Sequence, residues 1–498
     1  MRSRAAAGTT LPAAPTLARL GRALAAAGYS EDALSGRLRH PSTLDASPAD
    51  RPLHLALLDE GDALATLARL FLVDEPTSAS DAARALRPLE LAELAAEGLL
   101  AREEGAVRSP FRIQPHAGLL VASDHGFSPD AGPDYVGGVN PAARTLASLT
   151  IRAGLDSALD LGTGCGVQAL ALARHTGTVL ATDVNPRAVF LACLNAGLNE
   201  LSNVTCRSGS WFDPAGGARF DLIVSNPPFV ISPDTEFEFR DGGLARDGVS
   251  RLVATEAARH LTDGGFAQVM CNWVHEPRGD PAAPVRAWVE GGGCDALLLH
   301  HQSFDPLRYA AVWNRHLSEA RPPAFARSFE RWLDHYRREG IEAIGAGLVT
   351  LRRRASGGGW FLGLEASGRP PAGGGDQVLR IFSAQDRLAA LPSDRALLDD
   401  AFAPVEGHRI DQALTYRHGR YARHPAVIRL DAGAGIEAKV DAESLDVLFS
   451  LREDRSLGQI VADVAARKGR AEHEVEAGAL DAVRTLYERG LLVRAAGD

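Results

Sequence analysis

The order of apolar and polar positions divides the chain into a helical N-terminal part, a central part in which strands alternate with helices, and a mixed C-terminal part. Residues 17–24 and 55–72 have apolar side chains at helical spacing. In the central part, short apolar segments lead into loops or into helical patterns such as residues 167–173. The expected strands are a first one that ends in Ala158-Leu159, and residues 178–181, 204–207, 220–224, 266–270, 296–300 and 346–351. This alternation predicts an α/β core.

Two helical patterns interrupt the core between its last two expected strands, at residues 306–317 and 325–338. The second pattern places four aromatic residues on one helix face: Phe325, Phe329, Trp332 and Tyr336. One interpretation is that this face packs on the sheet or on the next domain. The other is a substrate cap from which the arginines point outward, namely Arg327, Arg331 and Arg338.

The two flanking parts resemble each other in the order of their elements. In the N-terminal part, short helices at residues 82–86 and 89–95 precede a leucine pair and a charged β-turn that ends at Val107. The C-terminal part has expected strands at 427–430 and 436–440, helices beginning at 441, 456 and 475, and a closing strand at 490–493. Both patterns resemble winged-helix modules, which bind nucleic acid or recruit a substrate. The balanced or acidic charge of both parts favours an accessory or protein-binding role.

Two glycine-rich stretches, residues 357–359 and 370–375, are predicted linkers. We therefore expect three domains, for which 498 residues suffice. They are a helical, winged-helix-like accessory domain over residues 1–122, a core domain over 123–355 with a helical insertion at about 302–342, and a winged-helix-like α+β domain over 356–498.

A segment rich in Gly, Pro and Asp, residues 124–140, comes before the first core helix and is predicted to be a loop. Phe127, Tyr135 and Asn140 are candidates to line a pocket, and simple packing is the alternative for each of them.

Composition narrows the possible functions only slightly. A net charge of −10 gives no global electrostatic attraction for nucleic acid, although a local basic patch would suffice. Five cysteines have neither Cys-x-x-Cys nor zinc-type spacing, so we expect small buried side chains and no metal site: Cys165, Cys193, Cys206, Cys271 and Cys294. No apolar run reaches the roughly 18–20 residues of a membrane span, and arginines interrupt the first apolar segment. We expect a cytoplasmic protein with no membrane partner.

The most informative stretch begins where the first core strand ends. Residues 160–166, Asp-Leu-Gly-Thr-Gly-Cys-Gly, join an apolar strand to the helix at 167–173. Glycines in such a turn let the backbone approach a ligand at a helix N-terminus. Asp183 stands at the tip of the next strand, about 20 residues further along. A carboxylate there can accept hydrogen bonds from the two hydroxyls of a ribose.

A second motif, Asn226-Pro227-Pro228-Phe229, follows the strand at 220–224. Its prolines fix φ and remove two backbone donors, so the loop becomes a rigid platform for backbone carbonyls and for the Asn226 amide. Phe229 can stack on a flat group. Such a platform suits a planar, weakly nucleophilic nitrogen, because the N–H groups of that nitrogen need two acceptors to orient them.

Taken together, these motifs resemble the class I S-adenosylmethionine-dependent methyltransferases, and within them the N-methyltransferases with an Asn-Pro-Pro-aromatic motif. The strongest resemblance is to the release-factor glutamine methyltransferase family, over residues 156–270. Gly209-Ser210-Trp211-Phe212 also resembles the Ser-Asp-Trp-Phe of that family. The resemblance implies a Rossmann-like, seven-stranded methyltransferase sheet and S-adenosylmethionine as the cofactor.

The resemblance also implies roles for individual residues. Asp183 would hold the ribose, Trp211 would flank the adenine, and the glycine turn would surround the methionine part. The full set expected to bind the cofactor is Asp160, Gly162, Thr163, Gly164, Gly166, Asp183, Trp211 and Asn226. The expected catalytic residues are Asn226 and Pro227, which would accept the N–H bonds of the target, and Phe229, which would pack on the planar group. Since the methyl group of this cofactor is already activated, the protein has to align the reactants and needs no metal.

Two positions depart from the pattern of the glutamine methyltransferases. Ser210 stands where that family has Asp, and Phe229 stands where it usually has Tyr. The Phe form also occurs in rRNA guanine and RNA adenine methyltransferases. The resemblance to the glutamine methyltransferases and the acidic net charge favour an N-methyltransferase acting on a protein or peptide. Phe229 and the winged-helix-like flanking parts favour the alternative, an RNA base N-methyltransferase. A third possibility, a cofactor-sensing binding protein, is disfavoured by the intact Asp160, Asp183 and Asn226.

Overall fold

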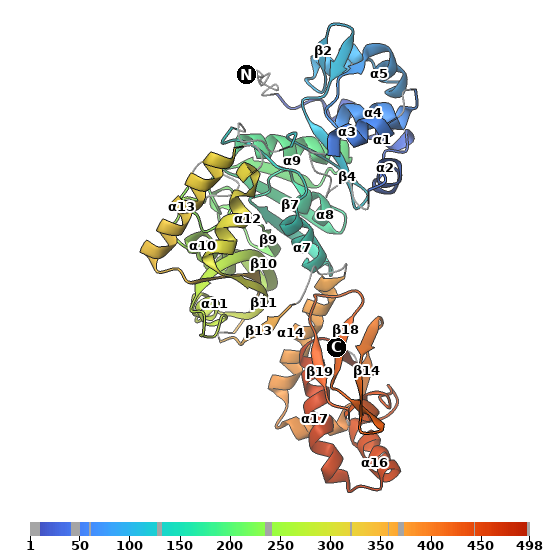
Figure 1. Ribbon diagram of the computed structural model, residues 1–498, viewed down its shortest axis with the longest axis vertical. Coiled ribbons are helices and arrows are strands. Elements are labelled where there is room, and N and C mark those ends of the chain that lie inside the picture. Colours follow the sequence, from blue (N-terminus) through green and yellow to red (C-terminus); the bar gives the residue numbers. More distant parts are fainter. Residues whose placement is uncertain are drawn as a thin grey trace. The chain divides into compact units, whose positions relative to one another are not determined.

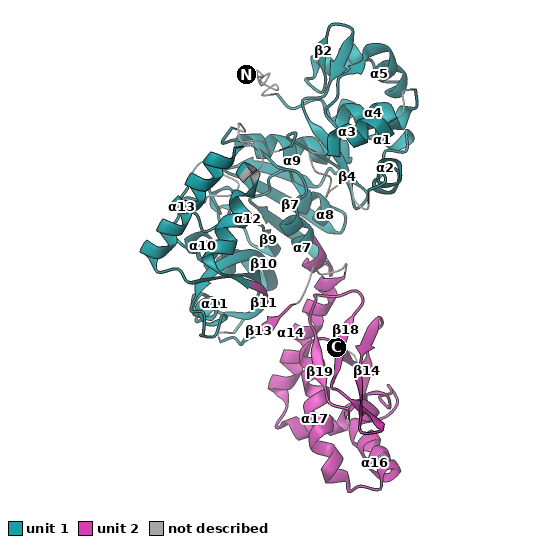
Figure 2. Ribbon diagram, viewed as in Figure 1, with its two compact units in different colours: residues 1–146, 154–298, 303–362 teal, residues 147–153, 299–302, 363–498 magenta. Residues whose placement is uncertain are grey.

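The structure is a computed structural model that describes nine ranges of the chain (Figure 1): residues 10–40, 50–58, 61–126, 132–234, 242–318, 321–356, 358–366, 373–442 and 444–495. Contacts divide the chain into two compact units (Figure 2). Unit 1 comprises residues 1–146, 154–298 and 303–362, and unit 2 comprises residues 147–153, 299–302 and 363–498. The N-terminal part and the core thus share unit 1, and the finer division into three domains stays a prediction.

A mixed eight-stranded sheet forms the centre of the core, in the order β13-β11-β12-β10-β9-β6-β7-β8. The strands are β6 Leu155–Leu161, β7 Thr176–Asp183, β8 Val204–Ser208, β9 Phe220–Ser225, β10 Leu261–His275, β11 Cys294–Phe304, β12 Ala343–Arg353 and β13 Phe361–Glu365. Neighbouring strands from β8 to β10 are parallel, and β12 pairs antiparallel with β10. The predicted α/β, Rossmann-like core is confirmed.

The prediction of seven strands was wrong, because β13 extends the sheet beyond β11. The sequence pattern suggested a linker at residues 357–359, just before this strand. Gly359 instead runs so close to β11 that a Cβ atom on it would lie 2.0 Å from the carbonyl oxygen of Cys294. The Ala296 N–H donates to the Trp360 carbonyl at 2.8 Å. Glycine is therefore needed at position 359 for a close approach of two chain segments, which composition alone does not distinguish from a linker.

One helix of the core precedes β6 along the chain, and the others lie between these strands. They are α7 Pro141–Leu149, α8 Val167–Ala173, α9 Pro186–Leu198, α10 Gly248–Ala257 and α11 Ala283–Val289. The expected helical insertion between β11 and β12 is confirmed as α12 Pro306–Ser318 and α13 Pro322–Glu339. Strands β6 and β9 each end in four consecutive buried residues, which are apolar except for Asp160 and Ser225, as expected for parallel strands covered on both faces.

The N-terminal part is less helical than the sequence pattern suggested. It contains α1 Ala14–Ala26, α2 Glu31–Leu38, α3 Arg51–Leu57, α4 Ala63–Phe71, β1 Thr77–Ser78, α5 Ala79–Ala85, α6 Leu91–Ala96, β2 Ala101–Glu103 and β3 Ala106–Arg108. Strands β1, β3 and β2 form a small sheet in that order. A separate hairpin, β4 Arg112–His116 with β5 Leu119–Ser123, was not expected.

Helix α9 joins the N-terminal part to the core by two kinds of contact. Helix α1 packs so closely on α9 that a Cβ atom on Gly21 would lie 2.1 Å from the Leu198 carbonyl oxygen. The side chain of Asn195 accepts from the Ala122 N–H at 2.7 Å and donates to the Ala122 carbonyl at 2.8 Å, and Asn199 makes the same pair of bonds to Leu120. Because Asn195 and Asn199 are four residues apart on one helix face, they satisfy alternate backbone groups of β5.

Unit 2 contains α14 Gly374–Ala390, β14 Phe402–Pro404, β15 His408–Asp411, β16 Leu414–Arg417, β17 Arg420–Arg423, β18 Ala426–Leu430, β19 Ala438–Val440, α15 Ser444–Leu448, α16 Leu457–Lys468, α17 Glu472–Glu488 and β20 Leu492–Arg494. The expected pairing of 427–430 with 436–440 is confirmed by β18 and β19. The predicted linker at 370–375 is wrong over 373–375, because Gly374 and Gly375 are buried in the first turn of α14. Residues 370–372 lie outside the described ranges.

Among the described residues, no helix combines the length and apolar character that crossing a membrane would require.

Candidate active site

The candidate residues lie at the carboxyl ends of three neighbouring parallel strands. Leu161 in β6 pairs with Thr182 in β7 on one side and with Ser225 in β9 on the other. The residues that directly follow this row are Gly162, Asp183 and Asn226. Sheet register therefore brings the glycine turn, the acidic residue and the Asn-Pro-Pro loop to one edge, where α/β proteins bind ligands.

The glycine turn is held open by its backbone conformation. Gly162, Gly164 and Gly166 have φ values of 71°, 55° and 84°, which a residue with a Cβ atom adopts only with strain. The N–H groups of Gly162 and Thr163 both donate to the Thr182 carbonyl at 2.9 Å. Apart from the adjacent residues of the chain, no heavy atom of the described residues lies within 4 Å of a Cβ position on Gly162 or Gly164. The backbone is thus accessible at two points of the turn.

Asp160, near the end of β6, fixes the shape of this turn by hydrogen bonding. Its Oδ2 accepts from the Thr163 hydroxyl at 2.6 Å and from the Ala169 N–H at 2.9 Å. Burial raises the pKa of Asp160 to about 6, although both of these hydrogen bonds lower it. These bonds link the end of β6 to the turn and to the start of α8, so Asp160 and Thr163 have a clear structural role.

Asp183 has a different environment. Its Oδ2 accepts from the Gly164 N–H and its Oδ1 from the Asn185 N–H, each at 2.9 Å. Burial raises the pKa of this carboxyl group. A carboxylate oxygen can accept more than one hydrogen bond, so each oxygen has capacity left for a ligand hydroxyl.

The loop before the first core helix lies beside Asp183. The Asn185 side chain donates to the Asp134 carbonyl at 3.0 Å, and the Val136 N–H donates to Asp124 at 2.8 Å. Of the three residues considered as pocket lining, Tyr135 is buried and Asn140 caps α7 by accepting from the Ala143 N–H at 2.9 Å. Packing or capping thus accounts for both of them. The third, Phe127, lies outside the described residues.

Two apolar side chains are near the tip of β7. Trp211 is partly buried and has a φ of 45°, which is uncommon for a bulky residue. The Gly209 N–H donates to the Asp183 carbonyl at 3.0 Å, which keeps the loop containing Trp211 next to Asp183. Val184 is 58% exposed and directly follows Asp183. Sequence reasoning missed Val184, and its position just past the carboxyl end of a strand was the available signal.

The Asn-Pro-Pro loop contains an unusual polar atom. Ser225 anchors the loop, because its hydroxyl donates to the Leu161 carbonyl at 2.8 Å. Oδ1 of Asn226 is buried and has no hydrogen-bond partner within the described part of the chain. A buried acceptor without a partner costs about 1–3 kcal/mol. Pro227 is buried beside it.

The helical insertion holds the segment that follows this loop. Phe229 is partly buried and meets the Trp313 ring edge-on, with ring centroids 6.4 Å apart. The Ile231 N–H donates to the Tyr309 hydroxyl at 3.2 Å, and the Tyr336 hydroxyl donates to the Ile231 carbonyl at 2.8 Å. Trp332 donates to Asp234 at 2.8 Å. The packing interpretation of the aromatic face is therefore correct for Trp332 and Tyr336. Both belong to one buried cluster that contains this segment and Ile344 of the sheet strand β12.

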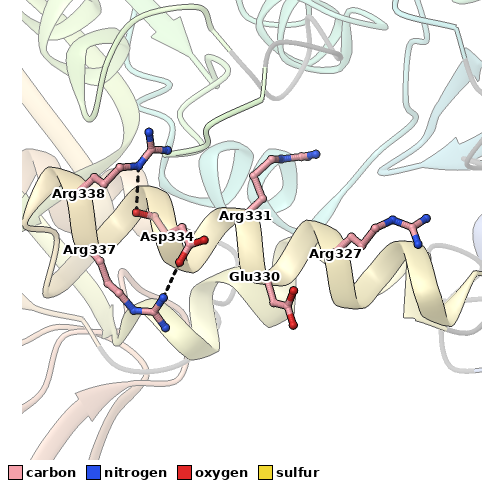
Figure 3. A pocket seen from close by; sticks show the side chains of 6 residues that line it. All are labelled: Arg327, Glu330, Arg331, Asp334, Arg337 and Arg338. Atoms are coloured by element: carbon pink, nitrogen blue, oxygen red, sulfur yellow. Dashed lines mark hydrogen bonds and ion pairs between the residues drawn. The ribbon is translucent and has the colours of Figure 1, made fainter.

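Exposed arginines line the outer face of α13, as Figure 3 shows. An open hollow of about 640 Å³ on this face is lined by Arg327, Glu330, Arg331, Asp334, Arg337 and Arg338. Arg337 pairs with Asp334 at 2.6 Å, and Arg338 donates to the Asp334 carbonyl at 3.3 Å. The expected outward direction of Arg327, Arg331 and Arg338 is confirmed. This hollow contains none of the candidate catalytic residues.

Within the described ranges, no group of three or more His, Cys, Asp or Glu side chains is arranged to hold a metal ion. Cys165, Cys271 and Cys294 are buried, and burial raises the pKa of each thiol. Cys193 and Cys206 are half-buried neighbours whose thiols share a hydrogen bond. The expectation of small buried side chains is therefore confirmed for three of the five cysteines.

Comparison with known proteins agrees with this geometry. Residues 136–275 match the methyltransferase small domain, and residues 18–110 match a domain of unknown function, DUF7059. A release factor glutamine methyltransferase from Xylella fastidiosa (strain Temecula1) is 37% identical over 151 residues, which are 28% of this chain and 52% of that protein. A ribosomal protein uL3 glutamine methyltransferase from Bradyrhizobium diazoefficiens is 37% identical over 126 residues, 22% of this chain and 40% of that protein. The chain spans about half the length of these curated relatives, or less.

Among solved structures, the YcgJ protein from Bacillus subtilis covers 43% of this chain and 99% of its own, with 16% identity and a TM-score of 0.30. Residues 136–275 are thus similar to a methyltransferase domain that uses S-adenosylmethionine. Within that class, the domain is similar to the release factor glutamine methyltransferases.

Proposed function

We propose that this chain is an S-adenosylmethionine-dependent N-methyltransferase that methylates the side-chain amide nitrogen of a glutamine in a protein. The observation that carries this proposal is the buried Oδ1 of Asn226, which has no hydrogen-bond partner among the residues that the structure describes. It belongs to a rigid loop at the same sheet edge as the glycine turn and Asp183. Both relatives described above are glutamine methyltransferases. A cytoplasmic location is part of this proposal.

The described residues suit the cofactor in three respects. The turn leaves its backbone accessible beside Gly162 and Gly164. Asp183 offers carboxylate oxygens for two ribose hydroxyls, and Val184 and Trp211 provide apolar surface for a flat adenine. The bound cofactor would supply an activated methyl group. Asp160 and Thr163 would act by holding the turn rather than by touching the cofactor.

The reaction requires orientation of a poor nucleophile. In a carboxamide, conjugation withdraws the nitrogen lone pair. Asn226 Oδ1 and the Pro227 carbonyl would accept the two N–H bonds and stabilise the positive charge that develops on nitrogen as conjugation is lost. Phe229, fixed against Trp313, would pack on the planar amide. The proton would leave for water after transfer, so no side chain has to act as a base.

An RNA base N-methyltransferase is the second candidate. Phe229 favours it, because exocyclic amines of bases present the same planar N–H groups to an Asn-Pro-Pro loop. The N-terminal elements α5, α6, β2 and β3, and the C-terminal α15 to β20, would then be winged-helix-like substrate readers. The winged-helix character of these two parts belongs to the proposal.

A labelling experiment separates the two candidates. The purified chain is incubated with methyl-labelled S-adenosylmethionine and an extract of cells that lack the gene, and the product is divided between protease and RNase. We expect the label to become soluble with protease and to survive RNase. After complete enzymatic digestion it should be recovered as N-methylglutamine, and after acid hydrolysis as methylamine. Label released by RNase would establish the second candidate. Tight cofactor binding without any label would contradict both.

A further inference from the structure

One hairpin of unit 2 exposes almost all of its side chains. Strands β16 and β17 pair only with each other, in the register Leu414↔Arg423, Thr415↔Ala422, Tyr416↔Tyr421 and Arg417↔Arg420. His418 and Gly419 connect them with φ values of 51° and 77°, as in a type I′ turn. A two-stranded hairpin in water is marginally stable alone, so this one gains little from burial. Its side chains are therefore available for a partner.

The aromatic face of the hairpin is well defined. Tyr416 and Tyr421 lie directly opposite each other, with ring centroids 5.1 Å apart and planes inclined by 59°. They are 63% and 69% exposed, and Leu414 on the same face is 54% exposed. The inclined rings present two separate flat surfaces. Clustered exposed aromatic side chains of this kind mark interaction sites.

The charge of the hairpin is entirely positive. Between residues 412 and 424 the chain has three arginines and no Asp or Glu. Arg417 and Arg420 lie directly opposite each other on the second face, which destabilises the hairpin by like-charge repulsion. The nearest acidic residue in the chain, Asp411, is already paired with Arg409 at 3.0 Å and Arg429 at 2.7 Å. A polyanion would relieve this repulsion.

An open hollow of about 640 Å³ adjoins the base of the hairpin. Its lining is Ile410, Asp411, Gln412, Ala413, Pro425 and Val427. Asp411 is paired with two arginines, and the Gln412 amide nitrogen donates to the His424 carbonyl at 3.1 Å. The amide oxygen of Gln412 beside this apolar surface can accept from a base edge or a sugar hydroxyl.

We propose that this hairpin, residues 412–424, binds single-stranded RNA. Bases would stack on Tyr416 and Tyr421, and phosphates would lie against Arg417, Arg420 and Arg423. An acidic peptide would be matched by the arginines but would gain little from two flat rings, so a partner with both bases and phosphates suits the whole surface better. This inference concerns a site separate from the methyltransferase edge and does not depend on the proposed reaction.

The test measures binding of the full chain to a labelled single-stranded RNA of about 12 nucleotides, within the usual site sizes. Replacing both rings, Tyr416→Leu with Tyr421→Leu, should weaken binding by about tenfold or more, because stacking is lost while apolar side chains remain. The matched variant, Tyr416→Phe with Tyr421→Phe, should bind within about twofold of the natural chain. RNA of the same length with abasic positions should bind the natural chain as weakly as the intact RNA binds the leucine variant.

The arginines are tested by salt dependence. Arg417→Ala with Arg420→Ala should reduce the slope of log K against log salt by about 1.4, since each phosphate contact on a single strand contributes about 0.7. A control with the same loss of charge, Lys439→Ala with Arg452→Ala, removes exposed cations outside the hairpin and should leave the slope unchanged.

Three results would overturn the proposal. Unchanged binding by the leucine variant would exclude stacking. Equal binding of DNA of the same sequence would exclude a preference for RNA. Full competition by a glutamate-rich peptide, insensitive to the leucine substitutions, would make the hairpin a protein-docking site.

Discussion

Asp160 and Asn226 stand at the ends of neighbouring strands, and both carry a buried oxygen. Oδ2 of Asp160 accepts two hydrogen bonds from its own chain, whereas Oδ1 of Asn226 accepts none from the described residues. The first arrangement gives a fixed turn. The second leaves an acceptor that the described residues do not satisfy and that a ligand can use. One sheet edge thus combines Asp160, which shapes the site, with Asn226, which is available to a ligand. Substitution of Asp160 should mainly lower stability, and substitution of Asn226 should mainly lower activity.

Asn226→Ala should have the largest effect on activity. We expect methyl transfer to fall by about 10²–10³-fold, the usual effect of removing one polar group that acts in the transition state. Stability should stay unchanged or rise by about 1 kcal/mol, because an unsatisfied buried acceptor is removed. Single-turnover transfer and urea unfolding measure the two quantities. Gln302→Ala, at an exposed amide, is the control, and transfer retained by Asn226→Ala would contradict the assigned role.

Asp160→Ala should show the opposite pattern. It leaves the Thr163 hydroxyl and the Ala169 N–H without an acceptor, so the free energy of unfolding should fall by about 2–4 kcal/mol. Asp156→Ala, at an exposed position of the same strand, should change it by less than about 0.5 kcal/mol. Equal stability of the two variants would show that Asp160 does not hold the turn.

The pH dependence of stability should carry the signature of Asp160. Its pKa in the folded chain, about 6, lies above the value of 3.8 for a free carboxyl group, so the folded state binds the proton more tightly. The stabilisation from this proton is complete below about pH 4 and is lost as the pH rises through about 6. The natural chain should therefore lose on the order of 3 kcal/mol over this window relative to Asp160→Asn. A constant difference between the two chains would refute the raised pKa.

Alanine substitutions at Gly162 and Gly166, two glycines of the turn, should differ by the smallest effect. Alanine at either Gly162 or Gly166 should cost about 1 kcal/mol, because both have positive φ. Gly166→Ala should cost more, since its Cβ would lie 3.1 Å from Ala192 atoms, whereas the space beside Gly162 is open. Gly162→Ala should instead weaken cofactor binding. Calorimetric titration with S-adenosylmethionine measures the loss of affinity, and thermal unfolding measures the loss of stability. Weaker cofactor binding by Gly166→Ala than by Gly162→Ala would contradict an accessible backbone at Gly162.

The sequence was sufficient to predict the strands of the core except β13, the position of the insertion and the residues that meet at the sheet edge. These follow from local patterns and from the register of parallel strands. The pairing state of Asn226 was not predictable, because it depends on every group packed around the loop. Gly359 and Gly374 were misassigned to linkers, since a glycine required by close packing has the same composition signal as a flexible one. The exposed hairpin of β16 and β17 also had a usable signal that was missed. This signal is the His418-Gly419 turn between two short segments in which larger side chains alternate.

The asparagine pair on α9 has a consequence for how the chain can be divided. The matched methyltransferase segment begins at residue 136, after the strand whose backbone Asn195 and Asn199 satisfy. A fragment starting there would expose two asparagine side chains and the apolar stripe that α1 covers. The methyltransferase domain and the part before it should therefore melt in one transition, and a search for a minimal enzyme should retain the N-terminal helices.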